Sequence, residues 1–236
     1  MPLERQVQSL AKNKKLILFI VEGITDETSL SLILSKLIEK DKIVKFELVR
    51  TDITTLKGTT SINIINKLSA QVKDFIKSDI YKKGDIEKII HIVDTDGAFI
   101  DESYIEYKDY KIKYTQEKIE VRDVNSIKRR NKQKSEVLSR LISTDSIYTG
   151  IPYEIYCFSC NLEHVLHNEQ NVHQDDKEKY AYMFEEQFAD NPEGFIEFIN
   201  NPDFAVHKGY KGSWDFIKPI ISYENLKISS RSYEKC

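Results

Sequence analysis

The chain has 236 residues and a mass of 27.6 kDa, with 38 acidic and 35 basic residues and a formal net charge of −3. This size excludes a large multidomain enzyme, and the near balance of charge excludes a generally basic nucleic-acid-binding protein. The longest apolar run, residues 16–21, is far too short to cross a bilayer, so no membrane association is expected. The three cysteines are too few for a disulfide scaffold, which favours a cytoplasmic protein.

Apolar patterns in the first hundred residues predict strands that alternate with helices. Residues 15–21 form a continuous apolar run, which is typical of a strand buried on both faces. A helical stripe of apolar residues follows over 30–38. The alternation continues with a strand at 43–50, a helix at 61–77 and a strand at 88–93. Strands connected through helices in this way predict a parallel sheet of the α/β class.

The second half of the chain is expected to contain an insertion and a helical extension. The segment of about 101–145 is a charged, Tyr-rich basic insertion that includes a helix at 126–143. A fourth strand is expected at 153–158. We therefore predict a Rossmann-like core over 1–165, with about four parallel strands flanked by helices, and a mostly helical extension over 166–236 packed on it.

Four carboxylates lie next to the expected ends of two strands. Glu22 follows the first strand, and Asp26 lies four residues later at the start of a helix. Asp94 and Asp96 follow the third strand. Because open parallel sheets bind ligands beyond the carboxyl ends of their strands, we expect these acids in one crevice. Their mutual repulsion and hard oxygen atoms favour Mg²⁺ or Mn²⁺ as the counter-ion.

Each of these acids also has a purely structural explanation. Asp26 is a residue type that the dipole favours at the start of a helix. Asp94 and Asp96 precede Gly97 and suit a turn. Turn and helix chemistry rarely explain two acid pairs at the ends of two strands, so a metal site is the preferred interpretation.

Two short motifs lie at the ends of the first and third expected strands: residues 20–27, Ile-Val-Glu-Gly-Ile-Thr-Asp-Glu, and residues 92–97, Ile-Val-Asp-Thr-Asp-Gly. They resemble the signatures of the Toprim fold, which occurs in topoisomerases, primases, ribonuclease M5 and small nucleases of the OLD and RloB type. The resemblance covers roughly residues 14–165. It implies that Glu22 is a general acid or base and a metal ligand, with Asp26 as a helper or a ligand of a second metal. It also implies that Asp94 and Asp96 bind Mg²⁺ or Mn²⁺.

Two further elements are similar to features of the OLD- and RloB-type nucleases. Glu163 follows the fourth strand, where the resemblance implies a further metal ligand; the alternative is an acid that caps a helix. Lys208 and Lys211 lie in a Gly- and Lys-rich stretch near the end of the chain. The late lysine of this family implies that one of them stabilises phosphate charge, and a solvated loop is the alternative.

A basic segment follows the Asp-x-Asp motif. Residues 108–140 carry 11 basic and 5 acidic side chains, interleaved with tyrosines. The centre of this segment is predicted to contact nucleic acid, and a solvated helix face is the alternative. The predicted nucleic-acid-binding residues are Lys128, Arg129, Arg130, Lys132 and Lys134. Residues 169–197 carry nine acids and two lysines, which favours contact with another protein.

Together these features predict a metal-dependent nuclease that acts on DNA or RNA, with tRNA among the substrates that remain open. The resemblance implies a role in bacterial anti-phage defence, with a separately encoded ATPase as partner and often a homo-oligomeric state. One alternative is a haloacid-dehalogenase-type phosphatase, because residues 94–97, Asp-Thr-Asp-Gly, also resemble its nucleophile motif. Another is a non-catalytic Toprim-like subunit of an ATPase complex.

Overall fold

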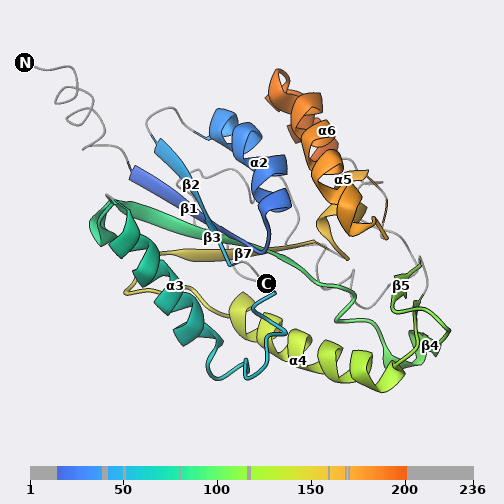
Figure 1. Ribbon diagram of the computed structural model, residues 1–236. Helices are drawn as coiled ribbons and strands as arrows, with labels where there is room; N and C mark the ends of the chain where they lie inside the picture. Colours follow the sequence, from blue (N-terminus) through green and yellow to red (C-terminus); the bar gives the residue numbers. More distant parts are fainter. Residues whose placement is uncertain are drawn as a thin grey trace, which may run out of the picture.

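The computed structural model describes residues 15–38, 42–49, 52–79, 81–115, 118–158, 160–167, 169 and 171–200. The predicted fold class is confirmed: helices lie on both faces of a four-stranded parallel sheet in a Rossmann-like arrangement (Figure 1). No helix in these ranges is long and apolar enough to cross a membrane. The principal elements are β1 (Lys15–Val21), α2 (Ile24–Leu37), β2 (Lys42–Leu48), α3 (Ile64–Ser78), β3 (Ile86–Asp94), β4 (Ile105–Tyr107), β5 (Lys113–Tyr114), β6 (Ile119–Val121), α4 (Val124–Ile142), β7 (Tyr153–Phe158), α5 (Leu162–His167), α6 (Lys177–Ala189) and α7 (Pro192–Asn200).

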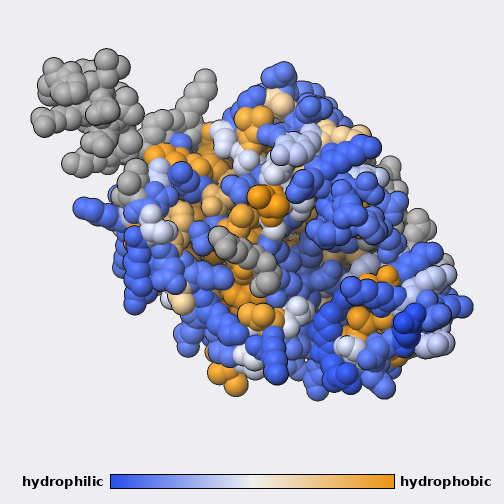
Figure 2. Space-filling view, in the orientation of Figure 1, coloured by the Kyte–Doolittle hydropathy of each residue, from blue (hydrophilic) through white to orange (hydrophobic). Residues whose placement is uncertain are grey.

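The central sheet has the strand order β2-β1-β3-β7, and each neighbouring pair is parallel. The pairing aligns Phe19 of β1 with Phe46 of β2 on one side and with Ile90 of β3 on the other. β2 is an edge strand and is half-buried along its whole length. Figure 2 shows hydrophobic residues gathered on the surface over this edge of the sheet.

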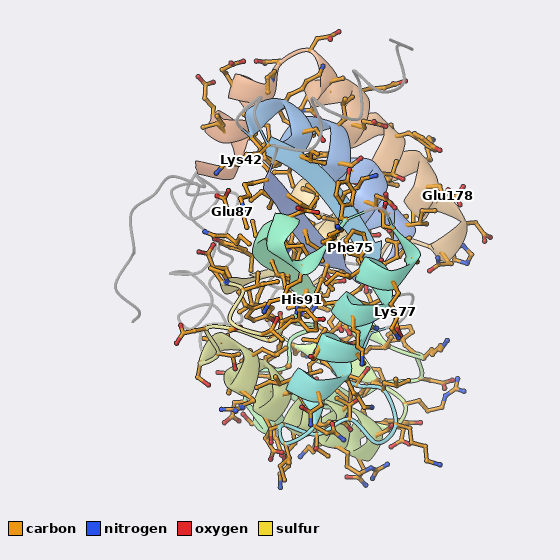
Figure 3. All side chains as sticks on the ribbon, turned by 90° about the vertical axis from the view of Figure 1, so that its left-hand side faces the viewer. Lys42, Phe75, Lys77, Glu87, His91 and Glu178 are labelled. Atoms are coloured by element: carbon orange, nitrogen blue, oxygen red, sulfur yellow. The ribbon has the colours of Figure 1, made fainter. Side chains whose placement is uncertain are left out.

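Alternate residues of β1 face opposite layers of the molecule, as the two-residue period of a strand requires. One set packs in the core beneath α3 and α4 and consists of Leu16, Leu18 and Ile20. The other set packs beneath α2, α6 and α7 and consists of Ile17, Phe19 and Val21. Figure 3 looks onto α3, on which Phe75 is buried against the sheet and Lys77 is exposed. An apolar run is therefore necessary in β1, because neither of its faces meets water.

The insertion contains a second, three-stranded sheet that no sequence pattern predicts. Its order is β4-β6-β5, with β4 parallel and β5 antiparallel to β6. Its strands have only two or three residues, so an alternating pattern is too short to be recognised. Ile119 and Val121 of β6 pack with Ile127 of α4 in a small separate core. The insertion is thus folded against the beginning of α4.

The described helices at the end of the chain share a core with the central sheet. α6 and α7 pack against α2, and the fully buried Phe184 of α6 lies in the same cluster as Ile17 and Phe19 of β1. The ring of Phe184 also contacts Phe188 and Phe195, with centroid distances of 5.0 and 6.0 Å. This aromatic cluster fixes α6 against the sheet. The first residue of α6, Lys177, is thereby held next to the carboxyl ends of the strands.

Candidate functional site

Acidic side chains follow every strand of the central sheet at the same edge. Because all four strands are parallel, their carboxyl ends lie together. Asp26 adds a further acid from the first turn of α2. The acids are Glu22 after β1, Asp52 after β2, Asp94 and Asp96 at the end of β3, and Glu163 on α5 after β7. The structure therefore brings the five acids expected from the sequence to one edge and adds Asp52.

The central acids are close enough to perturb one another. Burial raises the pKa of Asp94 well above its usual range, and the negative charges of Glu22 and Asp26 raise it further. Burial likewise raises the pKa of Glu22, although the positive charge of Lys134 opposes this effect. Like charges in a desolvated site favour the protonated forms unless a cation is nearby. A cation bound next to Glu22 and Asp94 would therefore favour their ionised forms.

Asp26 has a structural role as well as a place beside the site. Its Oδ2 accepts a hydrogen bond from the backbone N–H of Gly23 at 2.9 Å, which fixes the turn between β1 and α2. Burial raises the pKa of Asp26 to about 6, although the hydrogen bond from Gly23 lowers it. The helix-start explanation of Asp26 thus applies, and the same side chain still interacts electrostatically with Asp94.

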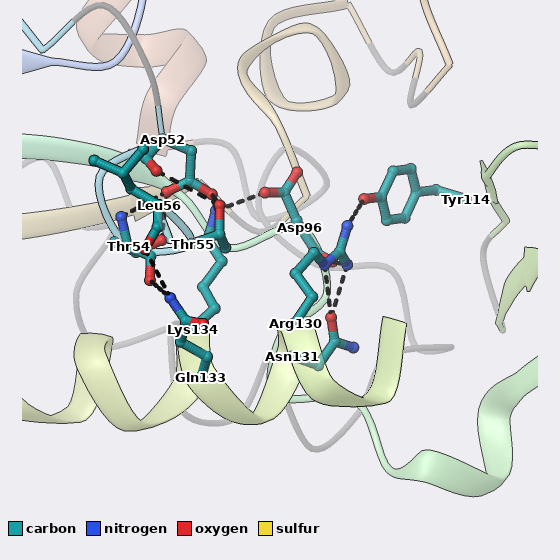
Figure 4. A network of polar contacts seen from close by, with 10 residues as sticks. All are labelled: Asp52, Thr54, Thr55, Leu56, Asp96, Tyr114, Arg130, Asn131, Gln133 and Lys134. Carbon is teal, nitrogen blue, oxygen red and sulfur yellow. Dashed lines mark hydrogen bonds and ion pairs between the residues drawn. The ribbon is translucent and has the colours of Figure 1, made fainter. Parts of the chain in front are cut away.

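Lys134 lies inside the acidic group rather than on the surface. Its side chain is fully buried, and its Nζ donates to Asp52 Oδ2 at 2.9 Å and to Asp96 Oδ2 at 2.5 Å (Figure 4). Burial lowers the pKa of this ammonium, but the charges of Asp96, Glu22 and Asp52 outweigh that effect and raise it well above its usual range. Lys134 is therefore a permanent cation within the site.

The loop after β2 supplies Asp52, a site residue that sequence reasoning missed. Its carboxylate accepts hydrogen bonds from the backbone N–H of Thr54 at 2.9 Å and from the Thr55 hydroxyl at 2.7 Å. Burial raises the pKa of Asp52, but Lys134 and the two threonines lower it below its usual range overall. An acid placed a few residues after a predicted strand and followed by hydroxyl residues is the signal that indicates this position.

The rest of the network ties α4 to two of the strand ends (Figure 4). Arg130 donates to the backbone oxygen of Asp96 at 2.8 Å and to the Tyr114 hydroxyl at 2.8 Å. Gln133 donates to the backbone oxygen of Thr54 at 3.0 Å. Asp96 has a φ of +48°, in the left-handed region that costs energy for a residue with a side chain. Contacts from α4 to both its backbone and its side chain hold Asp96 in this conformation.

Two of the five predicted nucleic-acid-binding residues are directed inward, which corrects the surface role expected for them. Lys134 is fully buried, and Arg130 is engaged by Asp96 and Tyr114. Arg129 and Lys132 are exposed, whereas Lys128 is half-buried and pairs with Glu102 of the insertion at 3.1 Å. Only part of the basic segment therefore faces solvent.

The sequence does contain a signal for the inward position of Lys134. Ile127, Asn131, Lys134, Leu138 and Leu141 recur at spacings of three or four residues, and all five are buried. Residues at this spacing share one face of a helix. A lysine on an apolar helical stripe indicates a charge that is paired inside the protein.

A second lysine lies at the other side of the acidic group. Lys177, the first residue of α6, pairs with Glu163 Oε1 at 2.9 Å, and Glu163 is almost completely buried. Asn161, rather than Glu163, accepts the hydrogen bond from the backbone N–H of His164 at 2.9 Å, so Glu163 is not needed as a cap. Lys208 and Lys211, the late lysines predicted from the sequence, lie outside the described residues.

The donor atoms at this edge fit a divalent cation in their chemistry. Glu22 Oε1 is buried without a hydrogen-bond partner, and the groups around it are carboxylates, whose oxygens suit Mg²⁺ and Mn²⁺. Among the described residues, no three His, Cys, Asp or Glu side chains are already arranged around one point as a metal site. Lys134 and Lys177 engage Asp52, Asp96 and Glu163, which leaves Glu22 and Asp94, beside Asp26, as the acids available to a cation.

Comparison of the chain with protein-family models, with curated proteins and with solved structures gave no match, so the conclusions about this site depend on its own residues and geometry.

Proposed function

We propose that this protein is a Mg²⁺- or Mn²⁺-dependent nuclease with a Toprim-like site that hydrolyses phosphodiester bonds in DNA or RNA. One observation carries the proposal: acids from the ends of all four parallel strands lie at one edge, and a buried oxygen of Glu22 among them has no partner. Carboxylates gathered at one desolvated edge repel one another and destabilise the folded state. Their presence together therefore indicates a function at that position.

In this proposal Glu22 and Asp94 hold the cation, with Asp26 beside them. When bound, Mg²⁺ supplies the positive charge that polarises a phosphate and acidifies a water molecule. In this proposal Glu22, at the end of β1, takes up the proton of the attacking water and delivers a proton to the leaving oxygen. Asp26 fixes the turn that carries Glu22 through its hydrogen bond with Gly23.

Lys177 is the described lysine that best suits the stabilisation of phosphate charge. Its ammonium pairs with Glu163 and is only half-buried. Burial lowers the pKa of this ammonium, whereas the pairing with Glu163 and the negative charges of Asp94 and Asp26 raise it. A partly exposed cation next to the acids is able to meet an anionic substrate, whereas Lys134 is enclosed. Lys177 therefore joins Lys208 and Lys211 as a lysine to test for this role.

The same proposal includes the biological role of the protein and its partners. The resemblance to small Toprim-like nucleases supports a role in anti-phage defence with a separately encoded ATPase, and a homo-oligomeric state. The acidic segment 169–197 includes α6, and the exposure of Tyr182 and Met183 on that helix supports the proposal that it contacts a partner protein.

The test is a cleavage assay with labelled DNA and total RNA, including tRNA, in Mg²⁺, Mn²⁺ or EDTA. Wild-type protein is compared with Asp94→Asn and with Asp74→Asn, an exposed acid on α3 that serves as the matched control. We expect cation-dependent cleavage that Asp94→Asn lowers by at least about a hundredfold and that Asp74→Asn leaves unchanged.

Each other outcome identifies an alternative. Hydrolysis of a phosphomonoester without cleavage of nucleic acid would support the haloacid-dehalogenase-type phosphatase. An absence of both activities, with cation binding intact, would support a non-catalytic subunit of an ATPase complex. Cleavage that is the same in EDTA and in Mg²⁺ would overturn the proposed function.

A further inference from the structure

Two lysines form ion pairs with three of the six acids at the site. Lys134 engages Asp52 and Asp96, and Lys177 engages Glu163. In the described part of the chain, no ion pair joins Glu22 or Asp94 to a lysine or arginine. Lys134 therefore bonds directly to Asp52 and Asp96, whereas it acts on Glu22 and Asp94 only through its charge at longer range.

The position of Lys134 is similar to that of a metal ion between two carboxylates. One nitrogen lies within 2.9 Å of Asp52 and 2.5 Å of Asp96, which come from the ends of two different strands. Its helix is anchored beneath the sheet by the fully buried Val137 and Leu138. The ammonium thus bridges two strand ends from a fixed support.

Both acids that Lys134 engages are also held from other directions. Asp52 accepts hydrogen bonds from Thr54 and Thr55, and the backbone of Asp96 is bound by Arg130. Turning the Asp96 carboxylate toward Asp94 would break its contact with Lys134, while Arg130 holds the Asp96 backbone in place. The two acids of the Asp-x-Asp motif therefore differ: Asp96 forms an ion pair with Lys134, whereas Asp94 forms none among the described residues and lies close enough to Glu22 for their charges to interact.

We infer that Lys134 takes the place of a second metal ion, so that the chain binds one divalent cation on the side of Glu22 and Asp94. This inference rests on the proposed metal-dependent function and specifies its stoichiometry. Lys134 is fully buried and so acts as a positioning residue: it fixes Asp52 and Asp96 and supplies permanent positive charge beside the cation. Asp96 then influences the cation only as a neighbouring charge.

The test is a titration of the full-length protein with Mn²⁺, with free Mn²⁺ measured by electron paramagnetic resonance. We expect one Mn²⁺ per chain in the wild type. Lys134→Met removes the ammonium while keeping a long side chain, and we expect this variant to bind two Mn²⁺ per chain. Lys132→Met changes an exposed lysine of the same helix and should still bind one.

A second pair of variants tests the inference without altering Lys134. Asp94→Asn is expected to weaken Mn²⁺ binding by at least about tenfold, because it removes a ligand. Asp96→Asn is expected to weaken binding by no more than about threefold, because it removes only a nearby charge. Equal losses in the two variants would overturn the assignment of Asp96 to Lys134, even if Lys134→Met failed to fold.

The remaining outcomes separate this inference from the proposed function. Two Mn²⁺ ions in the wild type, or one in both the wild type and a folded Lys134→Met protein, would overturn the inference while leaving a metal-dependent enzyme. An absence of Mn²⁺ binding in the wild type would overturn the proposed function and this inference with it.

Discussion

Replacing Lys134 by Met is the most informative change to stability in this protein. The substitution leaves the carboxylates of Asp52 and Asp96 facing one another without their shared cation. Removing one partner of a buried ion pair typically costs about 3–5 kcal/mol. The two aspartate side chains are 23% and 24% exposed, so water screens part of their repulsion. We therefore expect the lower end, a loss of about 3 kcal/mol in the free energy of unfolding.

Lys134→Met should also reverse the direction in which the titration of Asp52 changes the free energy of unfolding as the pH falls. In the wild type the pKa of Asp52 lies below its ordinary value of 3.8, because Lys134 and the threonines outweigh burial. The stability that the ionised Asp52 contributes is fully present above pH 3.8. It is lost as the pH falls through the lower pKa that Asp52 has in the folded state. Without Lys134, burial and repulsion raise the pKa of Asp52. The variant therefore recovers stability relative to the wild type between about pH 7 and about pH 4.

Urea unfolding followed by circular dichroism at several pH values measures both effects. Lys132→Met is the matched control, since it removes an exposed lysine from the same helix. A loss below about 1 kcal/mol for Lys134→Met, with the same pH dependence as the wild type, would refute the assignment of Lys134 as a buried counter-ion.

Two further predictions concern a buried histidine and the exposed part of the basic segment. Burial lowers the pKa of His91 in the folded protein to about 3, below the ordinary value of 6.5. As the pH falls below 6.5, the unfolded chain therefore binds a proton that the folded protein does not, and the free energy of unfolding decreases. Compared with His91→Leu, the wild type should lose about 2 kcal/mol more between pH 7.5 and pH 5 in urea unfolding; equal losses would contradict the neutral, buried state. Replacing the exposed Arg129 and Lys132 by Ala should weaken binding of labelled DNA or RNA equally for all sequences and reduce the slope of log K against log salt by about 2. An unchanged slope would show that these side chains do not contact phosphate.

The parts of the fold that could be predicted are those with a strong local pattern. The apolar run of β1 and the helical stripes identify a parallel α/β sheet, and Glu22 and Asp94 follow from the ends of their strands. The positions of Lys134 and Lys177 depend on contacts between residues far apart in the chain, so charge patterns alone do not reveal them. In α4 the run of basic residues predicts an outward surface that contacts nucleic acid, with a solvated helix face as the alternative, although the helical spacing places Lys134 on the buried face.

The order of the strands has a consequence for how the chain folds. β3 pairs with β1 on one side and with β7 on the other, and the second pairing aligns Ile89 with Tyr153. A nascent chain or truncated fragment that ends before Tyr153 leaves the apolar β3 with an open edge of unpaired backbone groups, which is prone to join strands of other chains. The same fragment lacks Glu163 and Lys177. During synthesis, protection against aggregation and completion of the acidic edge therefore depend on the same late segment.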